Sequence, residues 1–222
     1  MDYDNEHRKH LLACLQQIER LFYEWVGFSV SLALKTDFKE LIKSALFSFD
    51  TVKKKKALDR ELAKFSNQLD EIIKQGITNE WAFANLKQDK LLREGLTKYQ
   101  NLEALETFKK RKIKDFTVSN RVWDIAKKAQ TEIELALSVS LEEGKSAVQL
   151  SREVRNLLNN PTALFRRVRD KYGNLVLSKN AQNYHPGQGV YRSAYKNALR
   201  LASNEINVAY KSADWLRIQQ NP

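Results

Sequence analysis

The chain has no proline before Pro161, and this absence limits its fold more than any other feature of the sequence. Proline removes a backbone N–H and interrupts helices, and glycine weakens them, so both residues tend to mark helix ends. The chain has only three prolines and seven glycines among 222 residues. This distribution favours helices over strands. Hydrophobic residues make up 42% of the chain, enough to bury a core.

Apolar residues recur at steps of three and four, the spacing of an amphipathic helix. The pattern predicts a helix or helix pair over 6–34 and helices over 37–49, 58–72, 79–92, 119–141, 147–158 and 190–219, with a shorter polar connection over 101–118. Gly76 is expected to close the third helix, and Ser119 to cap the fifth. After Pro161, β-prone segments around Asp170 and Gly173 predict a small β-hairpin near 165–178. The predicted fold is mainly α: a multi-helix bundle with this hairpin and a long C-terminal helix.

Glu205 falls on the inward stripe of the last predicted helix, among small residues that permit close packing. The rest of that stripe is Ala194, Ala198, Leu201, Ala202, Val208, Ala209 and Ala213. Because a buried carboxylate needs a partner, we expect a structural ion pair between Glu205 and Arg152 or Arg155, with Arg166 and Arg167 as further candidates. A general-base role for Glu205 is the alternative. No second carboxylate or histidine lies at a spacing that would support it.

Cys14 and His185 are the other side chains that could suggest chemistry. Cys14 lies in an apolar run without a Gly-rich turn or a His-Asp pair nearby, so we expect a small buried side chain and not a nucleophile. His185 has no nearby Cys or Asp cluster, and a loop hydrogen bond is expected in place of a metal ligand. The segment 187–189 lacks the remainder of a phosphate-binding loop. The sequence therefore predicts no enzyme activity, metal, cofactor or small-molecule substrate.

The positive charge of the chain, +11 in total, gathers near the carboxyl end. Between Lys145 and Arg200 there are 11 basic residues against Glu153 and Asp170. Aromatic residues are interleaved with them, which suits sequence-independent contact with nucleic acid. A solvated face, or a surface that meets an acidic protein, would look similar. The predicted contacts to double-stranded DNA are Arg166, Arg167, Arg169, Lys171, Lys179, Arg192, Lys196 and Arg200.

Several segments between about residues 108 and 220 resemble the Mu F-like head-morphogenesis family of phages and prophages. They occur in the family's order: Ser119–Trp123, Glu143–Ser146, Leu150–Arg155, Leu164–Asp170, Tyr184–Tyr191 and Arg200–Tyr210. Together they cover about half of the chain. The family commonly has Arg-Thr-Glu where this chain has Ser203-Asn204-Glu205, so only the glutamate is retained.

The resemblance implies a structural minor capsid protein that associates with portal or inner capsid proteins and brings no catalytic residues. It further implies an N-terminal helical region over 1–100 and a head-morphogenesis core over 101–222 that ends earlier than in most of the family. The expected location is the virion interior or the bacterial host cytoplasm. Two alternatives stay open. One is a free-standing basic nucleic-acid-binding accessory protein, and the other is the delivery region of a phage-borne toxin without its effector domain.

The N-terminus gives no sign of secretion or of a membrane partner. Its first residues, Met1–Asp4, are acidic, whereas a signal peptide starts with basic residues. The most apolar stretch, Trp25–Leu34, is too short to cross a bilayer as a helix.

Overall fold

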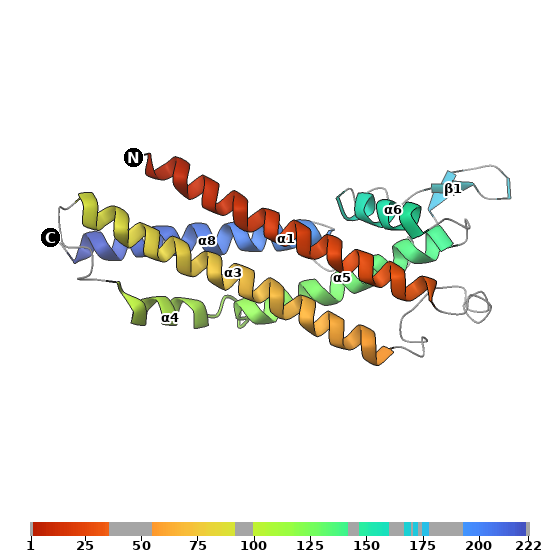
Figure 1. Cartoon of the computed structure of the whole chain (residues 1–222), viewed down its shortest axis with the longest axis horizontal. Coiled ribbons are helices and arrows are strands. Elements are labelled where there is room, and N and C mark those ends of the chain that lie inside the picture. The colour runs from red at the N-terminus through yellow and green to blue at the C-terminus, as the bar shows by residue number, and fades with distance from the viewer. Residues whose placement is uncertain are drawn as a thin grey trace. The chain divides into compact units, whose positions relative to one another are not determined.

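The computed structural model describes residues 2–35, 55–91, 100–141, 147–159, 167–169, 171–172, 175–177 and 193–220. Six helices lie in these ranges (Figure 1): α1 (Tyr3–Leu34), α3 (Lys55–Leu91), α4 (Leu102–Lys110), α5 (Val118–Leu141), α6 (Ala147–Asn159) and α8 (Ala194–Gln219). The prediction of a mainly helical chain with a long C-terminal helix is therefore confirmed. The helix predicted over 37–49 lies outside the described residues.

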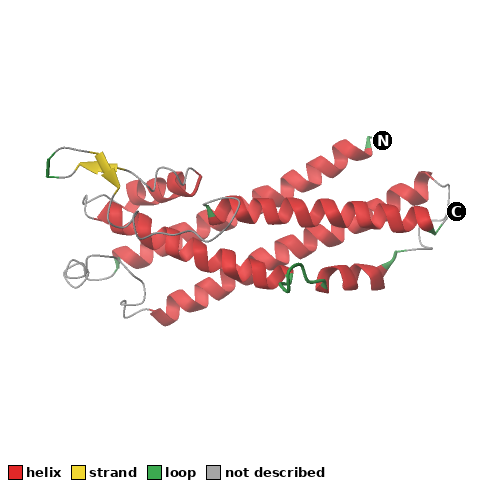
Figure 2. Cartoon of the chain, turned by 180° about the vertical axis from the view of Figure 1, so that it is seen from behind, coloured by secondary structure: helices red, strands yellow, loops and turns green. Residues whose placement is uncertain are grey.

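Two short strands, β1 (Arg167–Arg169) and β2 (Leu175–Leu177), lie within the range predicted for a hairpin. They pair antiparallel, with Val168 opposite Val176 (Figure 2). Of the residues between them the structure describes Lys171 and Tyr172, which form an exposed turn.

The helix α3 is continuous where the sequence predicted two helices separated by Gly76. Gly76 is buried inside it. A Cβ at this position would lie 2.6 Å from Cδ1 of Ile206 on α8 and 3.3 Å from the Cys14 sulfur on α1. The glycine therefore permits the close approach of neighbouring helices and does not end α3. The prediction of a helix end at Gly76 was wrong because glycine can serve packing as well as termination.

The start of α5 is capped by Thr117. The sequence had predicted Ser119 as the cap, and this prediction was wrong. Thr117 and Asn120 bond reciprocally: Thr117 N–H donates to Asn120 Oδ1 at 3.1 Å, and Asn120 N–H donates to Thr117 Oγ1 at 3.2 Å. This is the pattern of a capping box. Ser119 lies inside the helix, and its hydroxyl donates to Asp70 on α3 at 3.0 Å. The predicted connection over 101–118 contains the short helix α4.

The chain divides into two compact units, and the long helices contribute to both. Unit 1 comprises residues 1–20, 66–123 and 198–222, and unit 2 comprises residues 21–65 and 124–197. In unit 2, Phe22 packs edge-on against Phe65 and Tyr195, with ring centroids 5.0 and 5.3 Å apart. In unit 1, Trp81 of α3 packs on Phe108 of α4. The predicted boundary near residue 100 stays a prediction; both units draw on residues from either side of it.

Most positions predicted to face inward are buried. On α5 these are Val122, Ala126, Ala129, Ile133, Ala136 and Leu137. On α8 the predicted stripe is buried as well, except at Val208, whose exposed fraction is 45%. Among the residues that the structure describes, no helix combines the length and apolar character needed to cross a membrane.

Candidate functional site

The predicted DNA contacts are only partly placed by the structure. Lys171 is exposed in the turn after β1, and Lys196 and Arg200 are exposed one turn apart on α8. Arg167 and Arg169 belong to β1. The remaining predicted contacts, Arg166, Lys179 and Arg192, lie outside the described residues, as does His185.

Glu205 is buried and ion-paired, with partners that the sequence analysis did not choose. Its side chain is 3% exposed, and its two oxygens accept from different arginines. Arg111 Nη2 donates to Oε2 at 2.6 Å, and Arg121 Nη2 donates to Oε1 at 2.9 Å. Arg152 and Arg155 lie exposed on α6, where the Arg155 guanidinium lies over the Tyr23 ring at 5.1 Å. The observed partners lie 94 and 84 positions from Glu205 along the chain. Such pairing cannot be read from local spacing, so the choice of arginines was wrong.

Arg111 is held on three sides. Its guanidinium lies 3.4 Å from the centroid of the Phe108 ring and donates to the Phe108 carbonyl oxygen at 2.9 Å, in addition to its bond with Glu205. Burial lowers the pKa of Arg111, and the charge of Glu205 counteracts this effect. A guanidinium stays protonated in proteins, so the pair keeps both charges and acts as a fixed structural link.

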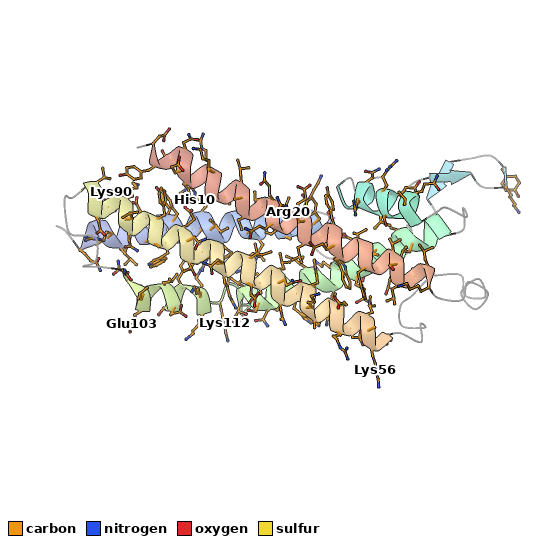
Figure 3. The ribbon with its side chains drawn as sticks, viewed as in Figure 1. His10, Arg20, Lys56, Lys90, Glu103 and Lys112 are labelled. Carbon is orange, nitrogen blue, oxygen red and sulfur yellow. The ribbon has the colours of Figure 1, made fainter. Side chains whose placement is uncertain are left out.

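A second polar cluster in unit 1 joins α1, α3 and α8 through Glu80, His7, His10 and Asn207. Glu80 is 1% exposed and lies on α3. Its Oε2 lies 2.5 Å from His7 Nδ1, and its Oε1 lies 2.7 Å from His10 Nδ1. His7 Nε2 lies 2.7 Å from the amide oxygen of Asn207. Figure 3 marks His10 on the N-terminal part of α1.

The protons in this cluster can be counted from its geometry. Asn207 Nδ2 donates to the Ser203 carbonyl oxygen at 2.8 Å, so the amide nitrogen faces Ser203 and the amide oxygen faces His7. His7 Nε2 must therefore carry a proton. The contact between His7 Nδ1 and Glu80 Oε2 is likewise a hydrogen bond, since two lone pairs would repel at that distance.

Aromatic rings surround the same cluster. The Tyr210 ring stacks on His7 with centroids 4.3 Å apart, and Phe83 stacks on Tyr210 and lies edge-on to His10. Burial raises the pKa of Tyr210. Nearby, Asp214 accepts from Lys87 and Gln88 at 3.2 and 2.5 Å. Burial works to lower the pKa of Lys87, but the hydrogen bond and charge of Asp214 together raise it above the ordinary value.

A pocket of about 320 Å³ is lined by Glu80, His10 and Cys14, together with Gln17, Asn79 and Ile206. Cysteine, histidine and a carboxylate form the catalytic set of some hydrolases, so this combination is a candidate nucleophilic site. The Cys14 thiol donates to the Ile72 carbonyl oxygen at 3.8 Å and not to an imidazole. Burial raises the pKa of Cys14 to about 11, whereas a reactive cysteine needs a lowered pKa. The arrangement lacks the features of an activated nucleophile.

A metal site receives no support from this cluster either. Within the described ranges, no group of three or more His, Cys, Asp or Glu side chains is arranged to hold a metal ion. Both oxygens of Glu80 bond to imidazole nitrogens, which occupies the positions that a metal would need.

Comparison of the chain with models of protein families, with curated proteins and with solved structures finds no match. The geometry of the chain is therefore the basis for arguing function, together with the resemblance described above.

The sequence analysis did not identify His7, His10 and Glu80. One signal was available: His7, His10 and Cys14 lie at steps of three and four and so share one face of α1, on which the His7 side chain is 12% exposed and that of His10 45%. Histidines at inward positions of a helix indicate a buried polar partner. Which residue supplies that partner depends on how α3 packs against α1.

Proposed function

We propose that the chain is a structural, non-enzymatic minor head protein of a phage or prophage that associates with portal or inner capsid proteins and touches packaged DNA. The resemblance over residues 108–220 motivates the proposal. The observation that carries it is the state of the buried carboxylates. All four that the structure describes, Glu80, Asp89, Glu132 and Glu205, are bonded to other groups of the chain.

Each of these carboxylates holds helices in place. Glu132 of α5 accepts from the Ala194 backbone N–H at 2.9 Å, at the first residue of α8. A carboxylate there satisfies a free N–H and lies favourably in the helix dipole. Asp89 of α3 accepts from Nε and Nη2 of Arg217, which is fully buried on α8. A general base needs an acceptor free for substrate, so these bonds favour a scaffolding role.

The surplus cations support the second part of the proposal. The buried cation Arg217 and the partly buried Arg111 and Arg121 are matched by carboxylates, while many other Lys and Arg side chains are exposed. A chain with net charge +11 and exposed cations attracts the phosphates of DNA without reading its sequence.

Binding to a 30-base-pair duplex, followed by fluorescence anisotropy, tests the DNA contact. We expect affinity to fall steeply with salt, and to fall further when Arg166, Arg167 and Arg169 are all changed to Gln. The matched control is Arg8→Gln/Lys90→Gln/Lys211→Gln, which removes the same charge from exposed sites of unit 1. Equal losses of duplex affinity in both triple variants would show that net charge alone accounts for the binding. Stable binding to one defined sequence would favour a free-standing regulatory or accessory protein.

Co-expression with a phage portal protein tests the main claim. We expect the full-length chain to co-purify with the portal in high salt, where DNA contacts are weak. The full chain has to be used because α8 supplies Glu205 and Arg217 to the core of unit 1. Failure to associate with portal or capsid proteins, in the presence and absence of DNA, would refute the structural role.

A further inference from the structure

The turn between α4 and α5 carries a cluster of exposed lysines and apolar side chains that the proposed function does not use. Residues 109–116 read Lys-Lys-Arg-Lys-Ile-Lys-Asp-Phe, five cations against one acid. We call this segment the basic turn. Lys109 bonds to Glu106 at 2.9 Å and Arg111 to Glu205 at 2.6 Å. The other three, Lys110, Lys112 and Lys114, are exposed, and no ion pair is found for them within the described part of the chain.

The tip of the basic turn is a two-residue hairpin. Ile113 N–H donates to the Phe116 carbonyl oxygen at 3.0 Å, and Phe116 N–H donates to the Ile113 carbonyl oxygen at 3.2 Å. Lys114 and Asp115 between them have φ of 52° and 65°. Positive φ at both central residues defines a type I′ turn, for which Asn-Gly is the favoured pair. Residues with a Cβ are held here against their preference.

Both ends of the basic turn are fixed. Arg111, near the start of the turn, and Arg121, beyond its end in α5, bind the same carboxylate, Glu205. The capping box of Thr117 and Asn120 secures the entry into α5. The turn is therefore held in one conformation before any partner arrives, which lowers the conformational entropy lost on binding.

Ile113 and Phe116 form an exposed apolar pair on this fixed turn. As direct cross-strand partners, their side chains project from the same face. Their exposed fractions are 43% and 50%. Lys112 precedes Ile113 in the sequence, and Figure 3 shows its side chain directed away from the helices. A solvent-exposed ring among exposed lysines offers a stacking surface for a base and charges for the phosphates on either side.

We propose that the basic turn is a binding site for single-stranded nucleic acid, with a base stacked on Phe116 against Ile113 and phosphates held by Lys110, Lys112 and Lys114. Unpaired bases fit better than a duplex, because a ring can stack only on a base face that no neighbouring base covers. A lipid bilayer fits poorly, because the two residues at the apex, Lys114 and Asp115, are charged and would have to enter it ahead of the apolar pair. Its residues are not among the predicted duplex contacts, and the proposal does not depend on a role in a virus head.

The test compares the full-length protein and four variants for binding to a 20-nucleotide oligo-dT, a 20-base-pair duplex and phosphatidylserine vesicles. Phe116→Leu keeps an apolar side chain but removes the ring, and Phe116→Trp restores a ring and adds a fluorescent reporter. Lys110→Gln/Lys112→Gln/Lys114→Gln removes the lysines. The control triple at Arg8, Lys90 and Lys211 removes the same net charge elsewhere. Circular dichroism checks that helix content is unchanged.

We expect Phe116→Leu to weaken oligo-dT binding about ten-fold and Phe116→Trp to restore it, with tryptophan quenching on binding. The turn-lysine variant should reduce the slope of log affinity against log salt by about two, and the control triple by less. Duplex binding should change little in Phe116→Leu. The proposal is overturned if Phe116→Leu binds oligo-dT as the wild type does, or if the two triple variants lose affinity equally. If the wild type and Phe116→Leu both bind phosphatidylserine vesicles while oligo-dT does not bind, the basic turn has a membrane-docking role instead.

Discussion

Arg111 and Arg121, ten residues apart, bind the two oxygens of one carboxylate, Glu205, at 2.6 and 2.9 Å. The carboxylate comes from α8, while Arg111 lies in the basic turn and Arg121 in the first turn of α5. One buried side chain therefore fixes both ends of the segment between them. This arrangement explains how a turn with two unfavourable backbone conformations can be held in a single shape.

Replacing Glu205 with Gln should destabilise the protein by about 2–3 kcal/mol, because both arginines would lose their counter-charge while staying partly buried. Urea unfolding followed by circular dichroism measures the change. Glu106→Gln is a matched control, since Glu106 is an exposed acid bonded to Lys109. Its unfolding midpoint should not move. Equal midpoints for wild type and Glu205→Gln would contradict a structural role for the pair.

Gly76→Ala should destabilise the protein by about 1–2 kcal/mol, although alanine normally favours a helix interior over glycine. The added Cβ would lie 2.6 Å from Ile206 Cδ1, too close without movement. Ile206→Val removes that methyl group. The double variant should therefore be more stable than Gly76→Ala alone, as measured by thermal or urea unfolding. A stabilising effect of the single Gly76→Ala substitution would show that the two helices are farther apart than described.

The thiol of Cys14 should make stability depend on alkaline pH. Its pKa rises from 9.0 to about 11 on burial. Below pH 9 the thiol is neutral in both the folded and the unfolded chain, and stability is unaffected. Between pH 9 and 11 only the unfolded chain ionises, so the folded state loses up to about 2 kcal/mol as pH rises.

This loss is measured as the difference in unfolding free energy between wild type and Cys14→Ala at pH 8 and at pH 10.5. Subtraction removes the effects of other groups that titrate in the same range, such as Lys87 and Tyr210. The difference should shrink with rising pH. If it stays constant, the thiol is accessible to water in the folded protein.

His7 should carry a proton on Nε2 in the folded protein at pH 7, because the Asn207 amide oxygen can only accept. Long-range ¹H–¹⁵N spectra of histidine-labelled protein report the state of each ring nitrogen. The chain has three histidines, so a His7→Gln variant assigns the signals. A lone pair on Nε2 of His7 would refute the proton count and with it the described orientation of Asn207.

Local patterns were enough for the helices and their buried faces. The steps of three and four that predicted α5 placed Val122, Ala126 and Ile133 in the core, and the structure agrees. The inward position of Glu205 followed in the same way, and a buried carboxylate requires a partner wherever it occurs. Gly76 shows the limit of this reasoning. A glycine that ends a helix and one that admits a neighbouring side chain look alike in the sequence.

The sequence by itself determined that the chain is mainly helical, that most of the predicted positions of α5 and α8 face inward, and that Glu205 needs a counter-charge. Helical periodicity is set by residues close together along the chain, and an unpaired buried charge costs free energy wherever its partner comes from. Only the tertiary structure decided that Arg111 and Arg121 supply the counter-charge and that His7, His10 and Glu80 meet in one cluster. These contacts join residues 70 to 200 positions apart, and their formation depends on how helices pack rather than on any local preference.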